Sequence, residues 1–312
     1  MKQTIRPVSG FFFALTTAIL WGTVPLALKP IIQVMSISTI VWYRFAVAAL
    51  GLLLILAFLR KLPKARLLFS PRFRWLVIIG IFCLGGNFLL FNSSLSYLDP
   101  AVTQVIAQVS PFMMMIASAV FLKEVIGITQ KIGATLLIIG LLLFFNERLA
   151  ELFTSMTEYT IGVLLSLSAS FVWVGYGLAQ KLMSRGFNSQ QILLIFYAGS
   201  ALLFTPMAEV SSIEHLPLLE LCCLAYCCLN TLIAYGAYGE AINRWEVSKV
   251  SAIITLTPLF TILFSEIAHW AAPQAFALPD LNLLSYIGAL VVVTGALCSA
   301  IGHKFLFRRN VL

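Results

Sequence analysis

Charged residues are scarce in this chain of 312 residues, of which only 10% are Asp, Glu, Lys or Arg. A soluble domain usually carries about 25% charged and about 45–50% apolar residues, whereas 61% of this chain is hydrophobic. A water-soluble globule of this length could not bury so much apolar surface, and a disordered chain would be far less hydrophobic. The scarcity of charge therefore excludes a soluble enzyme and a disordered protein.

Motifs for catalysis and metal binding are also missing. The three histidines fall at the expected ends of membrane spans, and the chain has no HExxH motif, no GxSxG motif and no pair of acids within one span. Four of the six cysteines fall on one expected helix, with no histidine or carboxylate among them, so we interpret them as small packing residues. We expect no catalytic residue, no metal, no cofactor and no disulfide.

Long apolar runs, by contrast, fill the chain. A membrane helix needs about 20 mostly apolar residues, and ten such runs can be placed with connections of at most about 15 residues. The first run is too long for a signal peptide, and Lys29-Pro30 follows it in place of a small-residue cleavage site, so we expect it to be retained. The sequence predicts an all-α integral membrane protein with spans at residues 9–28, 36–59, 75–94, 99–121, 130–146, 159–180, 188–208, 217–239, 248–268 and 283–303.

Lysine and arginine are distributed unevenly between the loops. Seventeen of the 20 fall on one side of the expected membrane, and such an excess marks the cytoplasmic side. The other side holds only Lys29 and Arg148, together with most of the acids. Because ten is an even number, both termini should be cytoplasmic, in a multi-pass protein of the cell (inner) membrane. The net charge of +8 is then a topology signal, and we expect no nucleic-acid partner.

The two halves of the chain repeat. At an offset of 152 residues, Trp21 matches Trp173 and Lys29 matches Lys181, and at an offset of 147 residues Pro111 matches Pro258. Glycines also match, in the pairs Gly10 with Gly162, Gly133 with Gly288, and Gly140 with Gly295. Each repeat, at residues 9–146 and 159–303, has five expected spans, and an odd number forces the second copy to enter the membrane inverted. Inverted repeats are typical of carriers that work by alternating access.

Arg44 is the clearest candidate for contact with cargo. A charge inside the membrane costs about 2.5–3.5 kcal/mol on insertion scales, so this side chain should face the protein interior. It could bind an anionic group such as a carboxylate or phosphate. It could equally pair with a carbonyl or an acid and hold two helices together. The repeat counterpart of Arg44 is Phe196, so the charge is not symmetric.

Polar residues beside a proline mark the fourth and ninth expected spans. Gln104 and Gln108 share a helix face, and Pro111 frees a carbonyl and bends the helix. The matching places in the second half hold Ser251, Thr255 and Pro258. We expect these stripes to line a central cavity, with interhelical hydrogen bonding as the alternative.

Aromatic residues extend the candidate site. Trp21 and Trp173 lie near mid-helix, away from the interfacial belts, and could stack on a flat or apolar ligand or simply pack. Further lining candidates are Tyr176, Tyr235, Tyr238, Asn87 and Asn92. Glu240 is a candidate for proton coupling, whereas Glu124 and Glu266 are expected at the membrane interface.

These residues together resemble the EamA-type transporters of the drug/metabolite transporter superfamily, over about residues 9–303. The resemblance rests on Trp21-Gly22, Arg44-Phe45, Pro111 followed by Phe121-Leu122-Lys123-Glu124, and their echoes around Pro258 and Glu266. It implies ten helices in two inverted five-helix repeats around a central cavity. Known members export amino acids and other metabolites, and many bacterial members use proton gradients. The stretch His269–Leu281 departs from the pattern by lengthening the last connection, which puts the role of Glu266 in doubt.

We therefore expect a secondary transporter that exports a small organic metabolite, such as an amino acid or a related compound, by alternating access. The expected partners are this small-molecule substrate and the lipid bilayer, with protons as a further candidate. An uptake carrier is the alternative, followed by a polytopic membrane enzyme, a channel, and a receptor or scaffold. The sequence leaves open the substrate, the direction of transport, the coupling ion and the oligomeric state.

Overall fold

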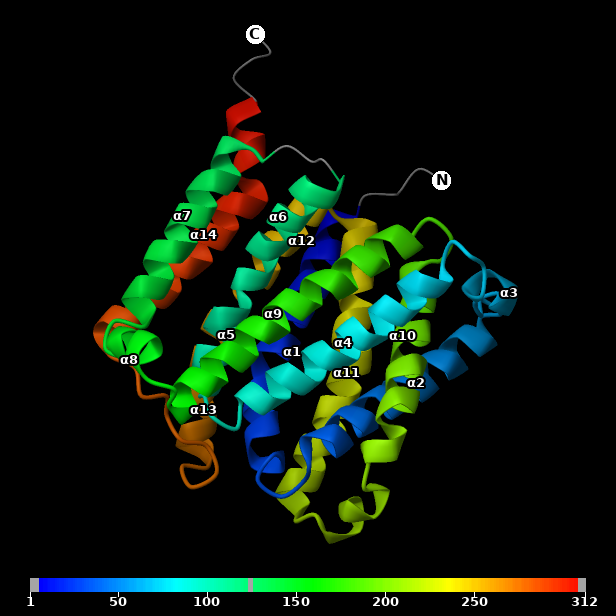
Figure 1. Cartoon of the computed structure of the whole chain (residues 1–312), viewed down its shortest axis with the longest axis horizontal. Helices are drawn as coiled ribbons and strands as arrows, with labels where there is room; N and C mark the ends of the chain where they lie inside the picture. Colours follow the sequence, from blue (N-terminus) through cyan, green and yellow to red (C-terminus); the bar gives the residue numbers. More distant parts are fainter. Residues whose placement is uncertain (1–5, 123–125, 308–312) are drawn as a thin grey trace.

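The structure, a computed structural model, describes residues 6–122 and 126–307, which form helices joined by short turns, with no strand among them (Figure 1). The helices are α1 (Pro7–Ile31), α2 (Ile37–Phe58), α3 (Ala65–Leu68), α4 (Arg74–Ser94), α5 (Pro100–Ala107), α6 (Val109–Leu122), α7 (Ile128–Phe144), α8 (Leu149–Thr154), α9 (Glu158–Met183), α10 (Ser189–Phe204), α11 (Leu218–Arg244), α12 (Val247–Ile254), α13 (Thr257–Ala271) and α14 (Leu283–Phe307). Two 3₁₀ turns, η1 (Thr205–Met207) and η2 (Val210–His215), lie between α10 and α11.

Nine segments of the described chain are long and apolar enough to cross a membrane. Two of these segments each combine two short helices, α5 with α6 and α12 with α13. The remaining expected span corresponds to α7, an apolar helix of 17 residues, which is shorter than the roughly 20 residues that a membrane helix needs. Nine of the ten predicted spans therefore correspond to segments long enough to cross a membrane, and the tenth corresponds to the shorter apolar helix α7.

The two prolines predicted to bend the fourth and ninth spans lie just beyond breaks in the helices. Gln108 stands between α5 and α6, three residues before Pro111, and Thr255 follows the end of α12, three residues before Pro258. Proline has no N–H, so it leaves unpaired the carbonyl four residues earlier. For Pro258 this is the carbonyl of Ile254, and the hydroxyl of Thr257 donates to it at 2.5 Å.

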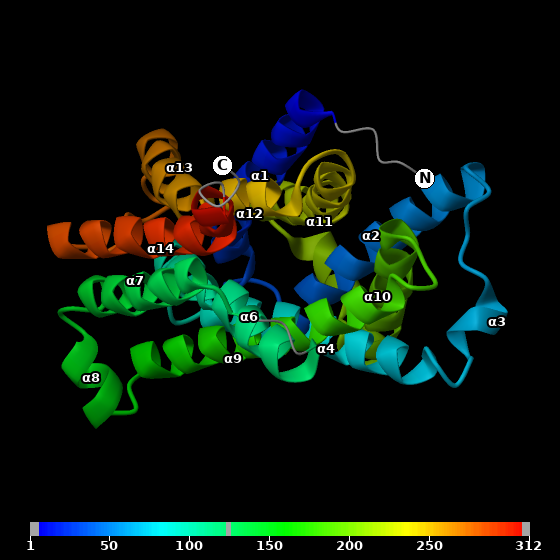
Figure 2. The ribbon, with the colours of Figure 1, turned by 90° about the horizontal axis from the view of Figure 1, so that it is seen from above.

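Four helix pairs make the main contacts of the bundle. α1 packs on α11, α4 on α9, α7 on α14, and α2 on α10, as both views show (Figures 1 and 2). The first turn of α1 and the last turn of α14 lie at the same end of the bundle (Figure 1). Exposed apolar side chains cover the outer faces of the bundle, including Leu54, Phe82, Ile138 and Phe171. Such a surface suits the hydrocarbon of a bilayer and not water.

Glycines let α7 and α14 approach closely. A Cβ atom added to Gly133 would stand 2.5 Å from the carbonyl oxygen of Gly295, and one added to Gly140 would stand 2.9 Å from that of Gly288. Real Cβ atoms do not come so near to backbone. The matched glycine pairs of the two halves therefore face each other across one seam, and small residues at such seams are what allow membrane helices to pack tightly.

Candidate functional site

The middle of α1 is held by side chains from three other helices. Pro25 lacks the N–H that would bond the carbonyl of Trp21, and Nε2 of Gln104, on α5, donates to that carbonyl at 2.8 Å. The two neighbouring carbonyls are occupied in the same way. Nδ2 of Asn230 donates to Leu20 at 2.7 Å, and the hydroxyl of Thr261 donates to Gly22 at 2.8 Å. Three consecutive carbonyls thus tie α1 to α11, α5 and α13.

Aromatic rings gather beside this point. The ring of Trp21 lies 5.2 Å from that of Tyr235 and 5.5 Å from that of Tyr238, measured between centroids. Tyr235 is also within 6.3 Å of Phe88. All three predicted residues, Trp21, Tyr235 and Tyr238, are only partly buried at the middle of long helices. Rings in this position can face an apolar solute within the bundle.

The second predicted tryptophan, Trp173, packs against the same hydrophobic core as Tyr235. Trp173 lies 5.9 Å from Tyr176, and Tyr176 lies 5.8 Å from Phe196. Tyr176 is buried, whereas Trp173 is partly buried. The structure therefore joins the predicted aromatic residues of α1, α9 and α11 through one hydrophobic core.

Arg44 is buried, with 5% of its surface exposed. Its Nε donates to the hydroxyl of Thr231 at 3.1 Å, and its Nη1 donates to Oδ1 of Asn92 at 3.3 Å. The guanidinium carbon also stands 4.4 Å from the ring centre of Phe88. No carboxylate pairs with Arg44 within the residues that the structure describes. The helices α2, α4 and α11 therefore share one buried cation whose partners are all neutral.

Asn92 adds a second donor at this place. It is fully buried, and its Nδ2 has no hydrogen-bond partner in the structure. A buried polar group without a partner costs about 1–3 kcal/mol. Arg44 and Asn92 were both predicted to contact cargo, and the structure places them together as a pair of hydrogen-bond donors.

The other predicted residues make local or interhelical contacts. Nδ2 of Asn87 donates to the carbonyl of Ala169 at 2.9 Å, which joins α4 to α9. The hydroxyl of Thr255 donates to Ala252 on its own helix, and Gln108 is buried at the break between α5 and α6. Gln108 and Thr255 thus occupy the same place in the two broken spans, as their spacing of 147 residues predicts.

The acidic candidates are scattered. Glu240 forms an ion pair with Arg244 at 2.9 Å, and the guanidinium of Arg244 lies over the ring of Phe13. Glu266 is exposed. Glu124 lies outside the described residues.

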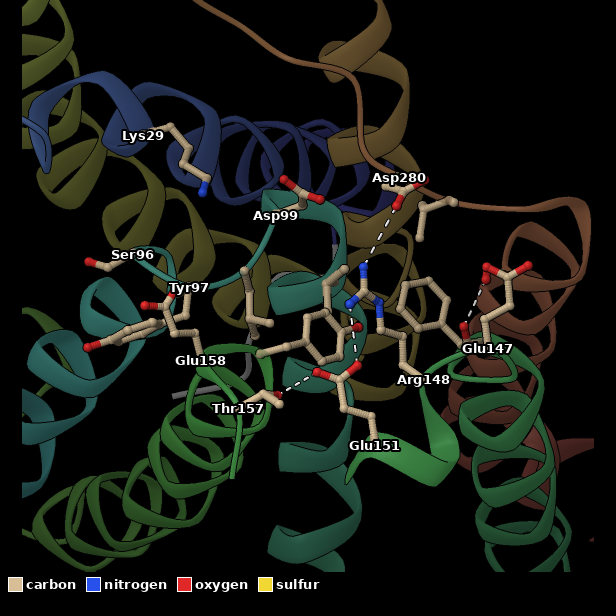
Figure 3. Close-up of a pocket in the computed structure, with 16 residues that line it drawn as sticks. Lys29, Ser96, Tyr97, Asp99, Glu147, Arg148, Glu151, Thr157, Glu158 and Asp280 are labelled. Carbon is tan, nitrogen blue, oxygen red and sulfur yellow. Dashed lines mark hydrogen bonds and ion pairs between the residues drawn. The ribbon is translucent and has the colours of Figure 1, made fainter. Parts of the chain in front are cut away.

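A cavity of about 540 Å³ lies where α1 ends and α9 begins (Figure 3). None of the predicted cargo residues lines it. Its charged side chains come from helices and turns that are far apart in the sequence and are Lys29, Asp99, Glu147, Arg148, Glu151, Glu158 and Asp280. Sequence reasoning counted these residues as signals of orientation only, and their positions on separate loops gave no sign that they meet.

Arg148 organises the charges of this cavity. Its guanidinium lies 3.3 Å from Glu151, 3.8 Å from Asp280 and 4.8 Å from the ring centre of Tyr159 (Figure 3). The hydroxyl of Thr157 also donates to Glu151. This hydrogen bond, with the contact to Arg148, holds the pKa of Glu151 below its ordinary value. The contacts link the α7–α8 turn to the long connection before α14.

Comparison with known proteins decides the family. The EamA-like transporter family matches the chain at residues 8–146 and 160–301, which is nearly its whole length. The chain belongs to this family. It is therefore a membrane transporter and not an enzyme, and its apolar helices make it a multi-pass protein of the inner membrane.

Several relatives of this EamA-like transporter have been named. It is 54% identical to an uncharacterized transporter of Haemophilus influenzae over 99% of this chain and 100% of the relative. It is 50% identical to the uncharacterized inner membrane transporter YhbE of Escherichia coli K12 over 95% of this chain and 92% of the relative. A more distant relative, 23% identical over 70% of this chain and 74% of its own length, is a probable amino-acid metabolite efflux pump of E. coli K12.

A solved crystal structure shares the fold of this EamA-like transporter. It superposes with a TM-score of 0.65 over 96% of this chain and 99% of the other, at 19% sequence identity. Because the identity is low, this likeness concerns the fold alone.

Proposed function

We propose that this EamA-like transporter exports a small organic metabolite by alternating access. In this proposal ten membrane helices form two inverted repeats, at residues 9–146 and 159–303, with both termini in the cytoplasm. The family membership and the broken fourth and ninth spans support a carrier, since carriers commonly bind cargo beside interrupted helices near the middle of the membrane. The name of the distant E. coli relative, an efflux pump, supports export and an amino-acid-like cargo.

Two interhelical hydrogen bonds at equivalent positions of the two repeats are the main structural support for this proposal. The hydroxyl of Thr17 on α1 donates to the carbonyl of Ala234 on α11, and Nδ2 of Asn87 on α4 donates to the carbonyl of Ala169 on α9. The offset of 152 residues converts position 17 into 169, and the offset of 147 converts 87 into 234. The two contacts therefore join equivalent positions of the two repeats. In the first contact the donor lies on α1, and in the second it lies on α4, whose counterpart α11 supplied the acceptor in the first. This agrees with a two-fold relation between the halves.

The same relation holds for helix packing. α1 lies on α11 as α9 lies on α4, and α7 meets α14, its own counterpart. Two halves that pack alike but face opposite ways give outward-open and inward-open states of similar energy. A carrier needs both states to be accessible.

In the proposed binding site the predicted side chains have different tasks. Trp21, Tyr235 and Tyr238 contact the apolar body of the cargo, together with Trp173 and Tyr176. Arg44 and Asn92 orient a polar group through their donors. Gln104, Gln108, Asn87 and Thr255 set the shape of the broken helices around the cargo. Coupling to protons through Glu240 requires its ion pair with Arg244 to open.

A metabolite screen tests the function. Cells that overproduce the wild type are compared with cells that make Arg44→Ala at an equal membrane level and with an empty-vector control, and extracellular metabolites are measured. We expect one amino acid or related compound to accumulate outside only with the wild type. If no compound differs between the wild type and the empty vector, export is wrong, and uptake of the same compounds is measured next.

A further inference from the structure

The connection between α2 and α4 carries an unbalanced positive charge. Residues 60–74 include six cations and no acid, and the first acid of the whole chain is Asp99. The six are Arg60, Lys61, Lys64, Arg66, Arg72 and Arg74, and all of them are exposed. We call these six residues, with the aromatic residues beside them, the α2–α4 basic surface.

These cations lack the carboxylate partners that other cations of the chain have. Arg148, Arg244 and Lys249 each form an ion pair with an acid of the chain. Within the described residues, none of the six cations of the α2–α4 basic surface does. Six like charges within 15 residues repel one another, so this surface gains free energy when anions come to it.

The surface is held in place by the rest of the protein. Nε2 of Gln191, on α10, donates to the carbonyl of Lys61 at 2.9 Å. The ring of Phe73 is buried and packs edge-on against Phe187 at 5.4 Å, and Gly186 lies directly against Phe73. The neighbouring Arg185 is also exposed and adds a seventh cation. The two ends of the connection are therefore anchored to α10 and to the turn between α9 and α10.

Aromatic and apolar side chains alternate with the cations. Phe58 is 89% exposed, Phe69 80% and Trp75 60%. The guanidinium groups of Arg72 and Arg74 lie 5.5 and 5.6 Å from the ring centres of Phe73 and Trp75. Exposed rings next to unpaired cations suit the headgroup level of a bilayer, where rings enter the acyl boundary and cations meet phosphates.

We propose that the α2–α4 basic surface binds the phosphate-bearing headgroups of anionic phospholipids. Clusters of four to eight cations directly beside a membrane helix gain about 1 kcal/mol for each charge near an anionic membrane surface. The ends of α2 and α4 set the depth of the surface at the edge of the hydrocarbon. Free phosphate lacks the acyl chains that Phe58, Phe69 and Trp75 would contact, so the lipid and not the free anion is the ligand.

Lipid binding by the purified full-length protein tests the proposal. Phosphatidylglycerol and phosphatidylcholine are titrated into the wild type, the double variant Lys64→Gln/Arg66→Gln and the matched control Arg6→Gln/Lys131→Gln. The control removes two exposed cations that also form no ion pair with an acid in the part of the chain that the structure describes. Affinity is read from lipid retained in native mass spectrometry and from the shift in thermal unfolding temperature, at low and high salt.

We expect the wild type to bind phosphatidylglycerol in preference to phosphatidylcholine, with an affinity that falls as salt is raised. The double variant should lose about tenfold in affinity for phosphatidylglycerol, and the control should stay within about twofold of the wild type. Equal binding of the two lipids, equal loss in the two variants, or displacement of the lipid by millimolar inorganic phosphate would each overturn the proposal. If the double variant is unstable, the lipid preference of the wild type and its dependence on salt still test the proposal.

Discussion

Nε2 of Gln104 donates to the carbonyl oxygen of Trp21, which is the carbonyl that Pro25 leaves without a partner. The proline and the glutamine lie on different helices, α1 and α5, yet each accounts for the other. With the donors Asn230 and Thr261 on the adjacent carbonyls, this contact fixes the middle of α1 beside the aromatic cluster of the proposed cargo site.

Replacement of Gln104 should therefore destabilise the protein. Gln104→Leu keeps the volume but leaves the buried Trp21 carbonyl unpaired, at a cost of about 1–2 kcal/mol. We expect a lower thermal unfolding temperature for the purified protein. Gln108→Leu, one helical turn away, is the control and should change it less. Equal unfolding temperatures of the two variants would show that the Gln104 contact does not stabilise the protein.

The α7–α14 seam makes a second prediction. Gly133→Ala places a Cβ atom against the backbone of Gly295 and should cost about 1–3 kcal/mol of stability. Gly236→Ala is the matched control because nothing lies within 4 Å of the added atom. Since alanine favours a helix over glycine by about 1 kcal/mol, the control should be neutral or stabilising. Unfolding in denaturant compares the two variants, and a stable Gly133→Ala would contradict the close approach.

A substitution that keeps the charge separates the two roles of Arg44. Arg44→Lys retains a cation but cannot bond Thr231 and Asn92 together as a guanidinium does. If Arg44 orients cargo, export should fall by about tenfold or more while stability changes by less than about 1.4 kcal/mol. Export of the identified metabolite and thermal unfolding are measured on the same variant. If a loss of stability accounts for the lost export, Arg44 holds helices together and does not orient cargo.

Orientation can be tested by labelling single cysteines. In a background without the native cysteines, Lys61→Cys and Ser96→Cys each expose a thiol at opposite ends of the bundle. With cytoplasmic termini, a membrane-impermeant maleimide added to intact cells should label position 96 only, and labelling of position 61 should require opened membranes. The reverse labelling pattern would contradict the predicted topology and place both termini outside the cytoplasm.

The contacts of Glu151 in the charged cavity predict that the stability of the protein depends on pH. The pKa of Glu151 is lowered by the Thr157 hydroxyl, so this contact stabilises the folded protein above the ordinary carboxyl pKa of 4.5 and is lost as the pH falls through the lowered value. Thr157→Val should therefore be less stable than Thr157→Ser at pH 7, with a difference that shrinks below pH 4.5. Thr157 also caps α9, which adds a part that does not change with pH. A difference that is constant with pH would exclude the Glu151 contribution.

Part of this arrangement could be predicted from the sequence. The glycines Gly133, Gly140, Gly288 and Gly295 were predicted as matching positions of the internal repeat, and the structure places them against each other on α7 and α14. The prolines Pro111 and Pro258 likewise predicted the broken spans, since a missing N–H acts on its own helix.

The rest depends on contacts between helices that no local pattern encodes. Gln104 was predicted to line a central cavity, with interhelical hydrogen bonding as the alternative, and its partner is a carbonyl on another helix, freed by a proline 79 positions earlier in the chain. Similarly, Arg44 on α2 and Asn92 on α4 were separate candidates, and their hydrogen bond becomes visible only in three dimensions. The charged cavity was missed because its side chains come from helices and connections that are far apart in the sequence.

Counterflow in proteoliposomes tests the central claim most directly. Vesicles containing the purified protein are preloaded with the unlabelled metabolite that the export screen identifies, and uptake of a labelled trace of it is followed. Alternating access predicts saturable, transient accumulation that depends on the preloaded metabolite and is much reduced in Arg44→Lys. Flux that rises linearly with concentration and ignores the preloaded metabolite would contradict a carrier.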